Sequence, residues 1–185
     1  MSTSGMDRYE MYIYLESLGF NVPIYGILND FRKLKKDINK VVVHLDLKSH
    51  RGENKILLDY EEALEKYRGK FATEYIETDG EFGVSYRYLR IGDEAFWLLY
   101  KSKNDWRSNC GSDIKIDILE IEKNTPPVIK SPLYAIDLVF DKYNNYHAID
   151  FNISPGIKGT GVEDILKPKE VVDKIKETIL YFRSR

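Results

Sequence analysis

Apolar residues recur at helical spacing near both ends of the chain. The first stripe predicts a helix over 6–18, and Gly19 is its expected stop. The second stripe predicts a final helix that begins at Pro168. The stripe residues are Met11, Tyr14, Leu15 and Leu18 in the first helix, and Val171, Val172, Ile175, Ile179 and Phe182 in the second.

Two shorter helices are predicted from local capping signals. Asp30 precedes a segment that we expect to be helical over 31–38. Asp59 precedes a helix predicted over 60–67, and Glu62 lies three residues after Asp59. A Ser, Thr or Asp followed at that spacing by Glu is typical of a capping box, in which two side chains satisfy free backbone N–H groups.

β-branched and alternating segments predict antiparallel hairpins joined by polar loops. The expected strand pairs are 41–45 with 55–58, 84–90 with 95–101, and 133–140 with 146–153, together with a strand over 71–76 and strand fragments within an irregular stretch between 104 and 132. Because the strands cluster instead of alternating with helices, this order predicts an α+β fold with antiparallel sheets and disfavours a doubly wound parallel sheet.

Composition narrows the function classes. A chain of 185 residues with 43% hydrophobic and 31% charged residues suits one domain or two small lobes that share a core. A net charge of -2 gives no global electrostatic basis for binding nucleic acid. The single cysteine, Cys110, fits a reducing compartment. With no apolar run near the length of a membrane span and no signal core, we expect a cytoplasmic protein.

The last predicted hairpin gathers acidic side chains on one face. Residues two apart in a strand share a face, so Asp150 and Asn152 point the same way. Asp137 faces Asp150 in one turn register and Asn152 in the other. Opposed carboxylates repel unless a cation lies between them or one is protonated, and oxygen ligands suit Mg2+ or Mn2+. The alternative interpretation is a solvated sheet face with ordinary surface residues.

Cationic residues suggest an anion-binding site, but this sequence signal is less specific than the acidic one. The basic tip 48–55 could fold over phosphates, or it could be a solvated turn. Arg87 lies within a strand and Arg107 within a polar turn, and arginine suits bidentate recognition of phosphate or carboxylate. Each of the two has an ordinary alternative as a surface or ring-stacked arginine. Cys110 and the three histidines show no zinc or triad spacing.

Taken in order along the chain, these segments resemble the ATP-grasp fold and, within it, the RimK-type carboxylate–amine ligases. The matching segments are the helix start at 7–23, the hairpin of 41–58, the hinge Thr73-Glu74-Tyr75-Ile76, the strand 86–92, the turn Asp105-Trp106-Arg107-Ser108-Asn109, and Asp137 followed by Asp150-Phe151-Asn152-Ile153-Ser154-Pro155-Gly156. The resemblance implies two α+β lobes whose antiparallel sheets sandwich a nucleotide. The smaller lobe is expected over about 30–75 and the larger over about 76–185.

The resemblance also implies a reaction and the residues that perform it. The expected reaction uses ATP and Mg2+ (or Mn2+) to join a small-molecule or peptide carboxylate to an amine through an acyl phosphate. By position in the motifs, the expected metal ligands are Asp137, Asp150 and Asn152, the expected nucleotide contacts are Arg8, His44, Lys48, Glu74, Tyr75, Ile76 and Glu77, and the expected catalytic groups are Arg87, Arg107 and Asn109.

The chain departs from the family at two lysine positions. Arg8 and His44 stand where the family usually has lysine, and Lys48 is the candidate to replace the charge lost at His44. The N-terminal domain that commonly precedes this fold is expected to be absent and replaced by a partner protein or a second copy. The alternative function is a catalytically degenerate ATP-binding module with a regulatory or protein-interaction role. A peptide- or nucleic-acid-binding domain without nucleotide affinity ranks lowest.

Overall fold

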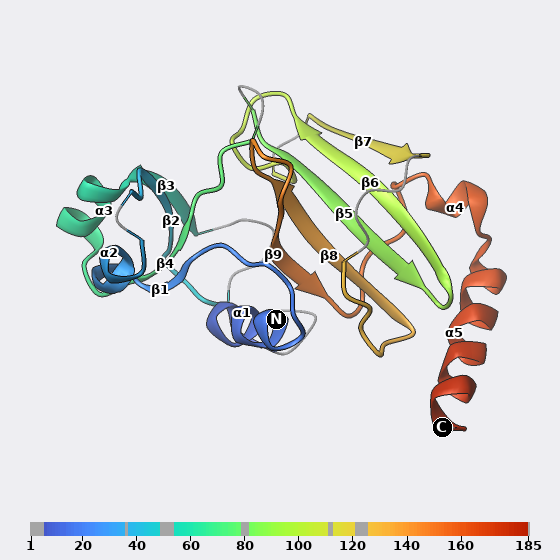
Figure 1. Ribbon diagram of the computed structural model, residues 1–185. Helices are drawn as coiled ribbons and strands as arrows, with labels where there is room; N and C mark the ends of the chain where they lie inside the picture. The colour runs from blue at the N-terminus through green and yellow to red at the C-terminus, as the bar shows by residue number, and fades with distance from the viewer. Residues whose placement is uncertain are drawn as a thin grey trace.

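The computed structural model describes residues 6–35, 37–48, 54–78, 82–110, 113–120 and 126–184. The fold is α+β, as predicted, with two antiparallel sheets that lie side by side and helices around them (Figure 1). Within the described residues, no helix is long and apolar enough to cross a membrane.

The smaller sheet has four strands in the order β1-β4-β2-β3. Its elements are β1 (Tyr25–Ile27), the 3-10 turn η1 (Leu28–Asp30), α2 (Phe31–Leu34), β2 (Lys40–His44), β3 (Lys55–Asp59), α3 (Tyr60–Tyr67) and β4 (Phe71–Glu74). Its core is built from fully buried side chains of β2, η1 and the two helices, among them Val41, Val43, Leu28 and Phe31. The predicted hairpin of β2 and β3 is confirmed, and in it His44 pairs with Lys55.

Two predicted capping details of this sheet are wrong. Helix α2 ends at Leu34 instead of 38, and the Asp30 carboxylate pairs with Lys33 rather than with the backbone. Helix α3 has the predicted bounds, but the Asp59 side chain makes no capping hydrogen bond. The N–H of Tyr60 donates to the carbonyl of Asn39 at 2.8 Å, which ties the start of α3 to the chain just before β2.

The larger sheet has five strands in the order β7-β6-β5-β8-β9. The strands are β5 (Val84–Ile91), β6 (Glu94–Ser102), β7 (Ile114–Leu119), β8 (Leu133–Phe140) and β9 (Tyr146–Asn152). Both predicted hairpins are present, and β7 is the ordered strand within the stretch expected to be irregular. Helix α1 (Arg8–Ser17) lies against this sheet and buries Met11, Tyr12 and Leu15 with Tyr134 and Phe151.

A bulge in β9 decides how the acidic residues meet. The β8–β9 register shifts between Asp137 and Leu138, which leaves Ile149 as the extra residue of β9. Asp137 then pairs directly with Asp150, while Asn152 pairs with Ala135. The first of the two predicted registers is therefore correct at the acidic pair, and all three polar residues lie on one face of the sheet.

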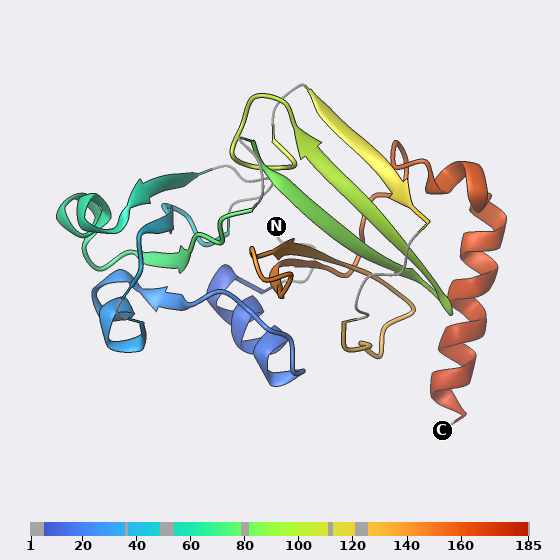
Figure 2. The ribbon, with the colours of Figure 1, turned by 45° about the horizontal axis from the view of Figure 1, so that its top comes forward.

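The C-terminal helices cover one end of the larger sheet (Figure 2). After α4 (Val162–Ile165), α5 (Pro168–Arg183) runs past the turn between β5 and β6, where Lys174 pairs with both Asp93 and Glu94. The predicted helix is confirmed, but α5 contains no fully buried residue. Its apolar stripe is only half-buried, because it meets the end of the sheet instead of a sheet face.

Candidate functional site

A cleft that is open to solvent lies between the two sheets. Both sheets, helix α1 and the turn before Cys110 contribute to its lining. The lining residues that matter below are Arg8, His44, Lys55, Thr73, Glu74, Tyr75, Ile76, Thr78, Trp106, Arg107, Asn109, Asp137 and Asp150.

One wall of the cleft is the chain that leaves β4. The N–H of Tyr75 donates to the carbonyl of Lys40 at 3.0 Å, which continues the sheet by one residue. Within the described part of the chain, the N–H of Ile76 has no hydrogen-bond partner. The ring of Tyr75 meets the ring of Trp106 edge to face, with centroids 6.1 Å apart. A flat heterocycle would find an apolar wall and a backbone donor here.

The two acidic residues of this wall differ from the prediction. Glu74 lines the cleft, but its carboxylate pairs with Lys35. Glu77 is exposed and is not among the lining residues, whereas Thr78 is.

The turn 105–109 forms the opposite lip. The Asp105 carboxylate accepts two hydrogen bonds from the Arg107 guanidinium, at 2.9 and 2.7 Å, and the guanidinium lies 5.5 Å from the Trp106 ring centroid. Gly83 allows this turn to lie against the start of β5. A Cβ at Gly83 would stand 2.3 Å from the Trp106 carbonyl oxygen, so no other residue fits without moving the turn. The motif resemblance does not include Gly83.

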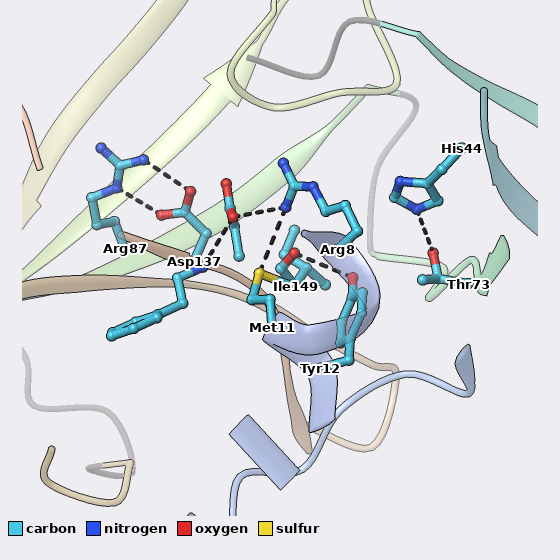
Figure 3. A network of polar contacts seen from close by, with 10 residues as sticks. Arg8, Met11, Tyr12, His44, Thr73, Arg87, Asp137 and Ile149 are labelled. Carbon is cyan, nitrogen blue, oxygen red and sulfur yellow. Dashed lines mark hydrogen bonds and ion pairs between the residues drawn. The ribbon is translucent and has the colours of Figure 1, made fainter. Parts of the chain in front are cut away.

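The paired carboxylates of Asp137 and Asp150 line the cleft, and each is held by an arginine; Figure 3 shows Asp137 with Arg87. Arg87 donates from Nε and Nη2 to the Asp137 carboxylate at 2.6 and 2.8 Å, and Arg8 donates from Nη1 to Asp150 at 2.7 Å. The Asp137 carboxylate raises the pKa of Arg87 despite burial. Burial is the largest single effect on the pKa of Arg8 and lowers it, but the Asp150 carboxylate, together with Tyr12 and Asp137, raises the pKa overall.

These ion pairs correct the physical premise behind the acidic pair. We expected carboxylate repulsion to require a cation between Asp137 and Asp150 or the protonation of one of them, but two guanidinium groups already supply positive charge. Two predicted residues are not among the cleft-lining residues: Arg87, which faces Asp137 from the neighbouring strand β5, and Asn152, two residues after Asp150 on β9.

The donor set nevertheless fits a hard cation that a ligand helps to bind. No group of three or more His, Cys, Asp or Glu side chains that could hold a metal exists within the described ranges. Two carboxylates remain, and in those ranges the Oδ2 atom of Asp150 makes no hydrogen bond. Mg2+ is commonly bound by one or two carboxylates, with phosphate oxygens and waters completing its shell. The residues thus fit a Mg2+ brought with a phosphate ligand, and not a closed protein cage.

The third feature of the cleft is a pair of basic residues, His44 and Lys55, which face each other across the β2–β3 hairpin. His44 is 3% exposed, and among the described residues its Nδ1 atom has no hydrogen-bond partner. Burial holds the pKa of His44 well below its ordinary value, and the charges of Lys55 and Arg8 lower it further. Burial, with the charge of Arg8 beside it, lowers the pKa of Lys55 to about 8.

Lys55 ends the basic tip 48–55 of the sequence analysis, but it is not among the predicted nucleotide contacts. Lys48, the expected replacement for a lysine at His44, is exposed and does not line the cleft. The rest of the predicted phosphate-covering loop, 49–53, lies outside the described residues. A sequence signal for Lys55 did exist, because the first residue of the second strand faces the last residue of the first strand in a hairpin of this register.

Comparison with known proteins identifies the fold. The sequence matches no protein-family model and no curated protein. Its structure is similar to the ATP-grasp ligase PsnB, with a TM-score of 0.66 and 15% identity over 95% of this chain and 60% of that one. The chain has the ATP-grasp fold. It is also similar to D-alanine–D-alanine ligase from Bacillus anthracis (TM-score 0.59, 14% identity, 100% and 70% covered) and to the D-cycloserine synthetase DcsG (TM-score 0.63, 10% identity, 94% and 68% covered).

The partial coverage and the low sequence identity limit what the structural similarity can show about this chain. The chain spans about 60% of the length of PsnB. Because the identities are only 10–15%, the structural similarity establishes the ATP-grasp fold alone, and a fold does not determine function. Function has to be argued from the cleft itself.

Proposed function

We propose that this chain is an ATP- and Mg2+-dependent carboxylate–amine ligase of the RimK type. The observation that carries the proposal is that one and the same cleft is lined by the hinge 74–76 of the smaller sheet and by Asp137 and Asp150 of the larger sheet. A nucleotide whose base lies at the hinge would direct its phosphates toward the carboxylate pair.

The proposed reaction has two balanced steps. A substrate carboxylate oxygen attacks the terminal phosphorus of ATP, and ADP leaves. The amine nitrogen then attacks the acyl carbon, inorganic phosphate leaves, and the nitrogen loses its proton to solvent. When bound, Mg2+ would neutralise charge on the nucleotide phosphates.

This chain's residues would bind and orient the reactants. The N–H of Ile76 would bind the base, and Arg8 would contact the phosphates from α1. Asp137 and Asp150 would hold the metal with Asn152 beside them. Arg107 and Asn109, on the turn opposite the hinge, would stabilise the transferring phosphoryl group or the substrate carboxylate. Arg87 would keep the Asp137 carboxylate aimed into the cleft.

The similar structures support a class of substrate. PsnB was solved with a minimal precursor, Mg and ADP, and the other two proteins are a D-alanine–D-alanine ligase and a D-cycloserine synthetase. We therefore propose a small-molecule or peptide carboxylate as one substrate and an amine as the other. The single cysteine is consistent with our proposal that the reaction takes place in the cytoplasm.

Trapping of the activated carboxylate tests this function. The full chain would be incubated with ATP, Mg2+, hydroxylamine and a panel of amino acids and short peptides, and both ADP and hydroxamate would be measured. The expected result is equimolar ADP and hydroxamate with at least one carboxylate. Asp117→Asn is the matched control for Asp137→Asn, because Asp117 lies on β7, at the outer edge of the same sheet.

Two results would separate the alternatives. ADP bound by the chain but never formed from ATP would support a catalytically degenerate nucleotide-binding module. ADP formed at the same rate with and without any carboxylate would contradict the ligase reaction.

A further inference from the structure

His44 and Lys55 occupy the same corner of the cleft from opposite strands. They are directly paired in the β2–β3 register, and both line the cleft. Residues paired in this way have Cβ atoms about 4.5–5.5 Å apart, so their side chains share one small region. Val42, two residues before His44 on the same face, also lines the cleft and confirms that this face points into it.

The protein leaves both side chains incompletely satisfied. The Nδ1 atom of His44 is buried and finds no partner in the described ranges, and its Nε2 atom is 3.5 Å from the Thr73 hydroxyl oxygen. In the described part of the chain, the Lys55 ammonium forms no ion pair or hydrogen bond with any residue. An unsatisfied buried polar atom is costly, so its presence beside an unpaired cation indicates a ligand that supplies acceptor atoms.

Among the described residues of the cleft, the Lys55 ammonium is also the charge that no ion pair neutralises. Arg8 is paired with Asp150 and Arg107 with Asp105, while Asp137 is paired with Arg87 and Glu74 with Lys35. The ionised groups whose charges act on Lys55 are Arg8 on α1, Arg107 on the turn, Asp137 on β8 and Asp150 on β9. Since each of these has an opposite partner, the positive charge of Lys55 is left for the ligand.

We propose that Lys55 and His44 together form a phosphate-binding site, in which the Lys55 ammonium supplies the charge and the neutral His44 imidazole donates its Nδ1–H. This assignment rests on the proposed function, because the phosphate is that of the nucleotide in the same cleft. In the matching tautomer, the Thr73 hydroxyl donates to Nε2 and leaves the proton on Nδ1.

Calorimetric titration with ADP and with adenosine, at constant Mg2+, tests the assignment. Lys55→Met should weaken ADP binding about tenfold or more, the usual effect of losing one charge-assisted hydrogen bond, and leave adenosine binding unchanged. Lys55→Arg should bind ADP nearly as the native chain does. Lys40→Met is the matched control, because Lys40 is an exposed residue at the other end of β2 and does not line the cleft.

Moving the charge across the hairpin gives a second, independent readout. In the double variant His44→Lys with Lys55→Met, a lysine on the facing strand would return an ammonium to the same corner. ADP affinity should then recover to within about threefold of the native value, a smaller change than the roughly tenfold loss expected for Lys55→Met alone. Lys55→Gln replaces Lys55→Met in both experiments if the methionine variant does not fold.

Three outcomes would decide between this site and the nucleotide function. ADP binding that is equally tight in Lys55→Met overturns the site, and so does an equal loss of ADP and adenosine binding, which indicates damage to the cleft. A native chain that binds neither ADP nor adenosine instead overturns the proposed function.

Discussion

Removal of the Asp137 carboxylate should destabilise the fold strongly. Asp137 is 5% exposed and Arg87 15% exposed at their side chains, and they share two hydrogen bonds. Asp137→Ala would leave the Arg87 guanidinium buried without its counterion, which typically costs about 3–5 kcal/mol. In a chain of this length, that corresponds to a melting temperature lower by about 6–20 °C. If carboxylate repulsion dominated instead, the same substitution would stabilise the protein.

Urea denaturation of a four-member cycle measures this effect. The cycle contains the native chain, Asp137→Ala, Arg87→Met and the double variant, and the double variant should lose less stability than the sum of the single losses. Asp117→Ala is the control, since Asp117 is 38% exposed in its pair with Lys115 and should change the free energy of unfolding by about 1 kcal/mol or less. An Asp137→Ala variant as stable as the native chain would refute the reasoning.

Three further predictions concern Lys55 and Gly83 at the cleft and, as a control away from it, Gly92. Because burial lowers the pKa of Lys55 to about 8 and a bound phosphate would restore it toward about 10.4, ADP affinity should fall about eightfold between about pH 7.5 and pH 9, and the Lys55→Arg profile should stay nearly flat. The sign follows from charge, since deprotonation above the lowered pKa removes the ammonium that binds phosphate. Gly83→Ala should displace the turn at Trp106 and weaken ADP binding about tenfold or more, with an unchanged far-ultraviolet circular dichroism spectrum. Gly92→Ala should lower stability by about 1–3 kcal/mol, because Gly92 has φ +64° and a Cβ would stand 2.9 Å from Lys174, yet ADP affinity should not change.

Local patterns were sufficient for much of the fold. Helical and alternating periodicity predicted α1, α5 and the three hairpins, and loop length restricted the acidic pair to two registers. Periodicity could not show that β9 carries a bulge at Ile149, which sets the final register. It also could not show what α5 packs against, because an apolar stripe is the same whether it meets a sheet face or a sheet edge.

Long-range partners account for what the sequence did not reveal at the site. Arg8 and Asp150 are 142 residues apart, and Arg87 and Asp137 are 50 apart, so no spacing rule connects them. The acidic pair was predicted from strand alternation, but the arginines that hold it were not. Lys55 is not among the predicted nucleotide contacts because its place in the cleft depends on its pairing with His44, and a long loop separates the two residues in the sequence.

The account's central claim is that the cleft between the two sheets binds an adenine nucleotide with Mg2+. Calorimetric titration of the intact chain with ADP, with and without Mg2+, tests it most directly. The account predicts one ADP per chain, tighter binding with Mg2+, and a melting temperature that rises with ADP concentration. No heat of binding and no change in melting temperature at millimolar ADP with Mg2+ would contradict it.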